Sequence, residues 1–163
     1  MDAVDQIISQ WRQSRPDLNL EPMALVGRIS RVGGLFAMEM SKTFKSHNLN
    51  AAAFDVLATL RRSGPPYALS AGELMRTMMI TSGSMTNRIQ RLEQAELVQR
   101  KVDTLDARKA SVQLTDKGFE TIELAVVDHL ATQAKLVGEL SESDAESLIR
   151  ILRLLEEQHS ENK

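Results

Sequence analysis

Apolar residues along this chain recur mostly at intervals of three and four, the spacing that places side chains on one face of an α-helix. This pattern predicts a short amphipathic helix over residues 2–14, and a long second helix from about Pro22 to Ser46. At roughly 1.5 Å per residue the second helix is about 36 Å long, more than a small domain needs internally. The stripe residues are Val4, Ile7, Ile8 and Trp11 in the first helix and Leu25, Ile29, Val32, Phe36, Met40 and Phe44 in the second.

Between residues 51 and 95 the predicted elements become shorter. One helix covers residues 51–62 and stops at the Ser-Gly-Pro-Pro sequence of residues 63–66, and a second opens at Ser70 and Glu73, whose spacing matches a capping box. A third helix covers about residues 81–95, with room for only a tight turn before it. Three helices joined this closely predict a helix-turn-helix unit.

After Leu97 the composition becomes strand-like over residues 98–102 and 110–114, with a polar, turn-forming segment between them. Two strands that follow a helix-turn-helix directly make a winged helix. Two further helices are expected over about residues 115–137 and 141–158. The predicted fold class is therefore mainly α with a small β-wing.

The last two predicted helices carry apolar residues on more than one face. A helix of this kind is normally buried, and a chain this small offers too little surface to bury both helices. We therefore expect a homodimer that pairs through the N- and C-terminal helices. The apolar positions are Ile122, Leu124, Val126, Val127, Leu130 and Leu136 in one helix and Leu148, Ile149, Ile151, Leu152, Leu154 and Leu155 in the other.

Composition narrows the class of protein. The 163 residues are 42% hydrophobic and 26% charged, which indicates a folded chain of about one domain, and the absence of cysteine excludes disulfides and thiolate metal sites. No apolar run is long enough to span a membrane and the N-terminus lacks a basic signal-peptide start, so a cytoplasmic protein is expected. Residues 1–117 hold 16 basic and 12 acidic residues, whereas residues 118–163 hold 4 and 10. The first part is therefore the one suited to a polyanion.

The helix predicted near residues 81–96 has two chemically different faces. Met85, Ile89 and Leu92 would anchor it to the core, while the opposite side carries hydrogen-bonding and cationic side chains and no acid before Glu93. Such a face suits the DNA major groove, where arginine pairs with guanine and asparagine with adenine; an ordinary solvated helix face is the alternative. The candidate DNA-binding residues here are Ser82, Ser84, Thr86, Asn87, Arg88 and Arg91.

The tip of the predicted hairpin is also basic. Arg108 and Lys109 could reach the neighbouring minor groove or a phosphate, with Asp106 bracing Arg108. Considered by itself, the tip is better explained as a solvated turn. Taken together with the helix face, the two features favour DNA binding.

Enzymatic chemistry finds little support. His47, His129 and His159 lie in different elements without a ligand partner one turn away, so neither a metal site nor any other cofactor is expected. Motifs of nucleophilic catalysis and of nucleotide binding are missing from the sequence. The sequence therefore predicts a protein that is not an enzyme.

Two residues look unusual for a purely structural role. Trp11 is the only tryptophan and lies on a short terminal helix, and Asp55 stands between Phe54 and Val56 in an apolar stretch. A carboxylate in apolar surroundings needs a partner, which Arg28 or Arg88 could supply. The structural alternatives are a core anchor for Trp11 and a simple ion pair for Asp55.

At this point the sequence resembles the MarR family of bacterial transcription regulators along almost its whole length. The segments that carry the resemblance are FDVLATLRRSG, LSAGELMRTMMITSGSMTNRIQRLEQAELVQR and DTLDARKASVQLTDKG. The resemblance implies a homodimeric winged helix that binds a pseudo-palindromic operator in double-stranded DNA and is released by a small molecule, often an aromatic acid. The cysteine-based redox sensing of some members is excluded here.

Two further features refine the resemblance. The N-terminal VDQIISQW with RPDLN, together with FDVLATL, is similar to the urate-responsive subgroup, which implies Trp11, Asp55 and Arg88 as ligand residues, with Arg88 linking the ligand site to the recognition helix; Arg28 is added as a candidate. The wing departs from the family's usual DPxDRR pattern at Thr104 and Ala107, which puts its minor-groove contact in doubt.

The resulting hypothesis is a ligand-responsive repressor released from its operator by a small aromatic acid or purine. Its organisation would be an N-terminal part, residues 1–46, for dimerisation and ligand binding, a DNA-binding lobe over residues 47–117, and C-terminal dimerisation helices over residues 118–163. The alternative is a winged-helix module for protein interactions without DNA function.

Overall fold

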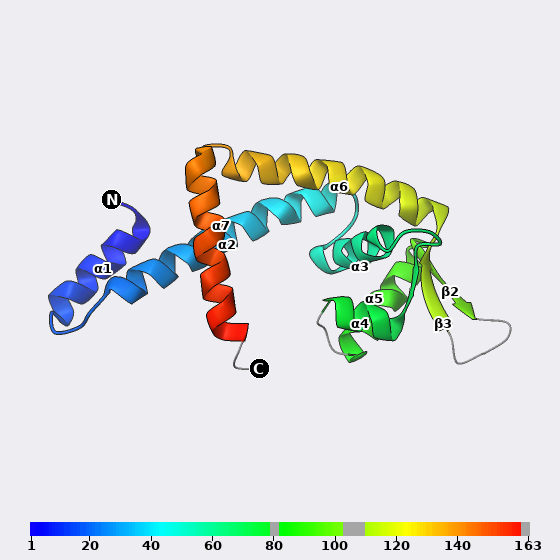
Figure 1. The fold of residues 1–163 in the computed structure, drawn as a ribbon, viewed down its shortest axis with the longest axis horizontal. Coiled ribbons are helices and arrows are strands. Elements are labelled where there is room, and N and C mark those ends of the chain that lie inside the picture. Colours follow the sequence, from blue (N-terminus) through cyan, green and yellow to red (C-terminus); the bar gives the residue numbers. More distant parts are fainter. Residues whose placement is uncertain (79–81, 103–109, 161–163) are drawn as a thin grey trace. The chain divides into compact units, whose positions relative to one another are not determined.

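The computed structural model describes residues 1–78, 82–102 and 110–160, and it divides into two compact units, residues 1–42 and 43–163. Figure 1 shows a mainly helical chain with one small sheet, which confirms the predicted fold class. In chain order the elements are α1 (Ala3–Ser14), α2 (Glu21–Ser46), α3 (Ala51–Arg62), β1 (Ala68–Ser70), α4 (Ala71–Met78), α5 (Ser82–Gln94), β2 (Val98–Val102), β3 (Ala110–Leu114), α6 (Asp116–Val137) and α7 (Glu142–Ser160).

The first unit contains α1 and most of α2. Val4 and Ile8 of α1 are buried against Leu20 and Ala24, so a small apolar cluster holds the two helices together. α1 begins with a capping box in which the side chains of Asp2 and Asp5 each accept a hydrogen bond from the other residue's backbone N–H.

In the second unit, helices α3, α4 and α5 pack around a common core. Its most deeply buried side chains are Val56, Leu57, Leu60, Leu74, Met85 and Ile122. Helix starts follow the expected chemistry: Asn50 caps α3 through a bond from the Ala53 N–H of 2.9 Å, and Ser70 and Glu73 form the predicted capping box at α4. These caps fix where the helices of the winged helix begin.

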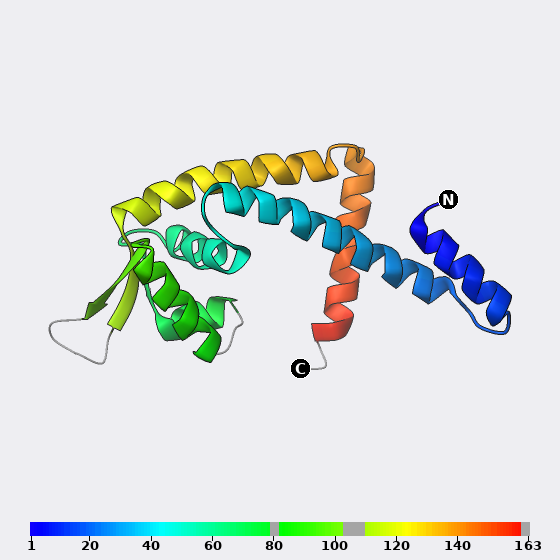
Figure 2. The same ribbon diagram turned by 180° about the vertical axis from the view of Figure 1, so that it is seen from behind.

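The sheet is antiparallel with the strand order β1-β3-β2. Strands β2 and β3 coincide with the two predicted strands and pair from Val98 opposite Leu114 to Val102 opposite Ala110. β1, which the sequence analysis did not predict, adds a third strand by pairing Leu69 with Val112. Figure 2 shows the sheet from the other side, next to α5. This arrangement confirms the predicted winged helix.

Helix α6 is joined to the rest of the second unit by an aromatic cluster. Phe44 in the last turn of α2, Phe54 in α3 and His129 in α6 lie with ring centroids 4.6 to 5.4 Å apart. The imidazole Nδ1 of His129 is buried and has no hydrogen-bond partner in the described part of the chain. Burial lowers the pKa of His129, although the nearby Asp55 carboxylate acts in the opposite direction.

Several helices expose apolar side chains in the single chain. Leu124, Val127 and Leu130 on α6 are each more than half exposed, and α7 exposes five large apolar residues. A soluble monomer rarely leaves apolar surfaces of this extent uncovered. The exposed apolar residues of α7 are Leu148, Ile149, Ile151, Leu152 and Leu154.

Candidate nucleic-acid interface

Helix α5 has the two faces that its sequence predicts. Met85, Ile89 and Leu92 are 1%, 2% and 3% exposed, so one side is fixed in the core. The remaining surface carries polar and cationic groups: Ser84, Thr86, Asn87 and Arg91 are exposed and Arg88 is half-buried. Ser82 begins the helix, and its side chain lies outside the described residues. The helix thus presents hydrogen-bonding side chains on a rigid support.

The arginines on the polar face of α5 are not neutralised by acidic side chains of the described residues. Within the described part of the chain, neither Arg88 nor Arg91 forms an ion pair. The nearest following acid in sequence, Glu93, is engaged by Arg100 of β2 at 3.1 Å. The positive charge of α5 is therefore available to an anionic partner.

Strands β2 and β3 form the base of the wing beside α5. The predicted DNA contacts at the wing tip, Arg108 and Lys109, lie outside the described residues, as does Asp106, which was expected to brace Arg108. The two predicted strands pair with each other from Val98 opposite Leu114 to Val102 opposite Ala110.

Arg88 and Asp55, two of the predicted ligand residues, line one pocket of about 200 Å³ in the second unit. Thr59, Arg62 and Met78 complete its walls, and the Arg62 guanidinium donates to the Thr59 hydroxyl at 3.0 Å. Sequence reasoning missed these three. A signal for Arg62 existed, because it stands seven residues after Asp55 and so lies two turns further along the same side of α3.

The structure corrects the expectation for Asp55. Its side chain is exposed, although Phe54 and Val56 on either side of it in sequence are buried. Successive residues of a helix point about 100° apart, so apolar neighbours in sequence do not surround a side chain. The carboxylate is therefore not desolvated and does not require a partner.

The two predicted ligand residues of the first unit have different surroundings. Trp11 is 42% exposed, so within this chain it is not the core anchor considered as its structural alternative. Arg28 forms an ion pair with Asp2 at 3.2 Å and donates a short hydrogen bond to Asp5. The bond to Asp5 is the main cause that raises the pKa of the Arg28 guanidinium.

The described residues offer neither a metal site nor a membrane-spanning helix. In the described ranges no group of three or more His, Cys, Asp or Glu side chains is placed to hold a metal ion. His47 pairs with Asp128 at 2.8 Å, whereas His129 belongs to the aromatic cluster. Over the same ranges none of the helices is both long and apolar enough to cross a membrane.

Comparison with known proteins indicates the family to which this fold and its helix α5 correspond. Residues 47–109 match the model described as MarR family. The chain is 38% identical to the HTH-type transcriptional regulator PecS of Dickeya dadantii over 160 residues, which are 98% of this chain and 96% of PecS. PecS is a transcriptional regulator, which supports the prediction that this chain is not an enzyme.

Solved structures show the same fold. A MarR mutant from E. coli, complexed with operator DNA, aligns with a TM-score of 0.72 at 22% identity, over 85% of this chain and 98% of that one. Bordetella bronchiseptica BpsR, whose DNA binding is regulated by 6-hydroxynicotinic acid, aligns with a TM-score of 0.68 at 25% identity, over 80% of this chain and 91% of BpsR. With its winged helix, its arginine-bearing helix α5 and a relative that matches it from end to end, the chain belongs to the MarR family of transcriptional regulators.

Proposed function

We propose that this protein is a ligand-responsive repressor that binds a pseudo-palindromic DNA operator as a homodimer. The observation that carries the proposal is the division of α5 into a buried face of Met85, Ile89 and Leu92 and an outer surface with two arginines that lack ion-pair partners in the described residues. The alignment with a MarR protein bound to operator DNA supports the same use of this fold.

The proposed DNA contacts divide by chemistry. Arg88 and Arg91 are proposed to contact bases or phosphates, and Asn87 has the groups that pair with adenine in the major groove. Hydroxyl side chains can bind phosphates or bases. In a symmetric dimer the two α5 helices would enter successive major grooves about 34–36 Å apart. The hydroxyl residues are Ser82, Ser84 and Thr86, and Arg108 and Lys109 are proposed as contacts of the wing.

The proposed effector is a small aromatic acid or a purine such as urate. Arg88 supplies a cation and Asp55 a hydrogen-bond acceptor in the pocket of about 200 Å³ on the side of α3, which suits a planar molecule with both acidic and N–H groups. Trp11 and Arg28 of the first unit are further proposed ligand residues. The regulation of BpsR by an aromatic acid supports an effector of this class.

The proposed release mechanism uses Arg88 in two roles. Because Arg88 lies on α5 and also lines the pocket with Asp55, an effector that recruits its guanidinium removes it from DNA and favours a dimer whose helix spacing does not fit the operator. A coupling of about 1–3 kcal/mol changes affinity roughly 5- to 150-fold. Residues 1–46 and 118–163 would form the dimer and residues 47–117 the DNA-binding lobe.

A gel shift with the intergenic DNA beside the protein's own gene tests the proposal. Binding that neutralises several phosphates should weaken steeply, by about 10³-fold or more, between 50 and 200 mM salt. A response that is flat in salt, or equal binding to any DNA, would instead favour a winged-helix module for protein interactions.

A thermal-shift screen of aromatic acids and purines, including urate, tests the effector. An Asp55→Asn variant should lose the thermal shift and the effector-induced release of DNA while keeping its DNA affinity, because Asp55 lies on α3 and not on the outer surface of α5. Trp11→Ala should behave similarly. If urate shifts neither the native protein nor its complex with DNA, the purine assignment is wrong.

A further inference from the structure

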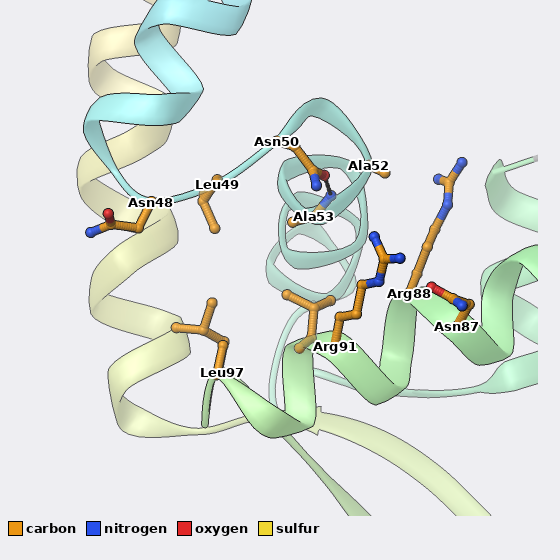
Figure 3. Close-up of a pocket in the computed structure, with 11 residues that line it drawn as sticks. Asn48, Leu49, Asn50, Ala52, Ala53, Asn87, Arg88, Arg91 and Leu97 are labelled. Atoms are coloured by element: carbon orange, nitrogen blue, oxygen red, sulfur yellow. Dashed lines mark hydrogen bonds between the residues drawn. The ribbon is translucent and has the colours of Figure 1, made fainter.

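A second cavity of about 290 Å³ lies on the other side of Arg88, between α5 and the start of α3. Figure 3 shows Arg88 and Arg91 extending from α5 toward the first turn of α3, where Asn50, Ala52 and Ala53 are placed. The cavity is open to solvent on the side of the two arginines, since Arg91 is exposed and Arg88 only half-buried. Both walls belong to the second unit of the chain.

The wall of this cavity is cationic and contains no acid. None of its eleven lining residues is a carboxylate, and within the described ranges neither arginine has an ion-pair partner. The first turn of α3 carries no acidic residue either. An anion that entered here would meet two guanidinium groups and no carboxylate in the cavity wall; Asp55 lines the other pocket beside Arg88, which leaves Arg91 as the cation farther from a negative charge.

Asparagine side chains extend the polar rim. The Oδ1 atom of Asn50 accepts the hydrogen bond from the Ala53 N–H at 2.9 Å, which leaves the Asn50 amide N–H groups as donors on the cavity side (Figure 3). Asn48 lies at the other end of the cavity, after the end of α2, in the left-handed backbone conformation (φ 57°) with its N–H bonded to the Lys45 carbonyl (Figure 3). The Asn50 amide is thus the neutral donor near the guanidinium groups (Figure 3).

The floor is apolar: Leu49, Leu92 and Leu97 are each less than a tenth exposed. An anionic group attached to a partly apolar body fits a cavity with a cationic rim and such a floor. A DNA backbone has this chemistry, because each phosphate is joined to a deoxyribose. The cavity shares Asn87, Arg88 and Arg91 with the outer surface of α5, so the two surfaces are continuous.

We propose that the operator contact extends from α5 onto the start of α3, and that the cavity between them holds a backbone phosphate of the operator, bound by Arg91 and Asn50. This inference rests on the proposed function and adds residues of α3 to the interface. It also makes a distinct prediction, because a phosphate contact positions the protein on any duplex and carries no sequence preference.

The test adds one negative charge to the cavity without altering α5. In Asn50→Asp the side chain keeps its shape and its capping oxygen, since Asp and Asn cap helices equally well. Asn19→Asp is the matched control: the Oδ1 atom of Asn19 accepts from the Glu21 N–H at the start of α2, so the same exchange is made at a second helix start in the first unit. Both variants change the net charge by the same amount.

Binding of the two variants is compared with the native protein on operator DNA and on an unrelated duplex between 50 and 200 mM salt. Asn50→Asp should weaken both affinities by about tenfold at the lowest salt and reduce the salt slope by about one per protomer. Asn19→Asp should stay within about twofold of the native protein, the precision of such measurements. Equal behaviour of the two variants overturns the inference.

A second arm identifies the partner group. Replacing single operator phosphates by neutral methylphosphonates should reveal one position per half-site where native binding drops and where Asn50→Asp no longer differs from the native protein. If no such position exists, the cavity is not a DNA contact. Stabilisation of the native protein, but not of the variant, by inorganic phosphate at constant ionic strength would in that case show that the cavity binds a free anion instead. Should Asn50→Asp unfold, Ala52→Glu compared with Ala52→Gln provides the same charge test.

The outcome separates this inference from the proposed function. If the native protein binds its operator with a steep salt dependence and Asn50→Asp binds equally well, the proposed repressor function stands. In that case α3 is not part of the DNA interface. If the native protein binds no DNA, both the proposed function and this inference are wrong.

Discussion

Gly118, in the first turn of α6, lies directly against the backbone carbonyl of Leu97, the residue before β2. A Cβ atom added at Gly118 would overlap the Leu97 oxygen and approach its carbonyl carbon, far inside normal contact distance. The same corner is fixed by a hydrogen bond from the Thr115 N–H to the Leu97 carbonyl at 3.2 Å. The end of α5, the base of the wing and the start of α6 therefore meet at one point of close backbone contact.

Gly118→Ala should destabilise the protein by about 1–3 kcal/mol, because a backbone segment has to move to accommodate the methyl group. Chemical denaturation followed by circular dichroism measures this loss. Gly72→Ala is the control, since a Cβ there meets only ordinary contacts with the Arg76 and Ser70 side chains and alanine favours a helix. A Gly118 variant as stable as the Gly72 variant would contradict the observed packing.

The half-buried imidazole of His129, whose Nδ1 atom is buried, predicts a pH dependence of stability. Burial lowers the pKa of His129 in the folded state from 6.5, and Asp55 only partly opposes this shift. The unfolded chain therefore binds a proton at this histidine more tightly than the folded protein does. The contribution of neutral His129 to the free energy of unfolding is thus fully present above pH 6.5. It declines as the pH falls through that value and then through the pKa of the folded state.

Denaturant unfolding at pH 8 and pH 5.5, at fixed protein concentration, checks this dependence. His129→Phe should lose less stability than the native protein between these two pH values, because phenylalanine preserves contact with Phe44 and Phe54 but does not titrate. His47→Gln, which removes the other histidine of this region, is the control. An identical pH response of His129→Phe and the native protein would refute the role of His129.

Local pattern was enough to predict most of the fold. Residues 98–102 and 110–114 form β2 and β3 because their strand-like composition agrees with the pairing available to them, and the Ser70–Glu73 capping box sets the start of α4. β1 was missed because three residues between a proline turn and a helix are too few to show a period. Its strand conformation depends on β3, more than forty residues later in the chain.

The candidate site shows where such reasoning fails. The buried and polar faces of α5 follow from helical spacing alone, but the pocket residues Thr59 and Arg62 belong to another helix, and only the packing of α3 beside α5 brings them to Arg88. The burial of Asp55 was predicted wrongly because its sequence neighbours were treated as its spatial neighbours. Contacts between elements depend on tertiary packing, which local periodicity does not reveal.

Arg91→Ala should weaken operator binding by about tenfold or more while leaving the dimer intact. Its guanidinium is exposed on α5 without an ion-pair partner in the described part of the chain, and a hydrogen bond that involves a charged group contributes about 1.5–3 kcal/mol. Gel shift gives the affinity and light scattering the oligomeric state. Arg12→Ala, which removes the same charge from the last turn of α1, should bind as the native protein does. Unchanged affinity of Arg91→Ala would show that α5 is not the recognition helix.

The exposed apolar stripe of α7 predicts where the dimer is most vulnerable. Leu148, Ile151 and Leu152 lie three and four residues apart and are 42–46% exposed in the single chain, so a partner has to cover them. Leu152→Glu would place a charge in that interface and should raise the dimer dissociation constant by about tenfold or more. Arg150→Gln makes the same change in net charge at an exposed residue of α7 outside this stripe and should leave the dimer unchanged. DNA binding requires two α5 helices at a fixed spacing, so Leu152→Glu should also lose operator affinity in proportion to the dimer that dissociates. Sedimentation measures the fraction of dimer, and a gel shift at the same protein concentrations measures the affinity. A Leu152→Glu protein that remains dimeric would place the dimer contact elsewhere.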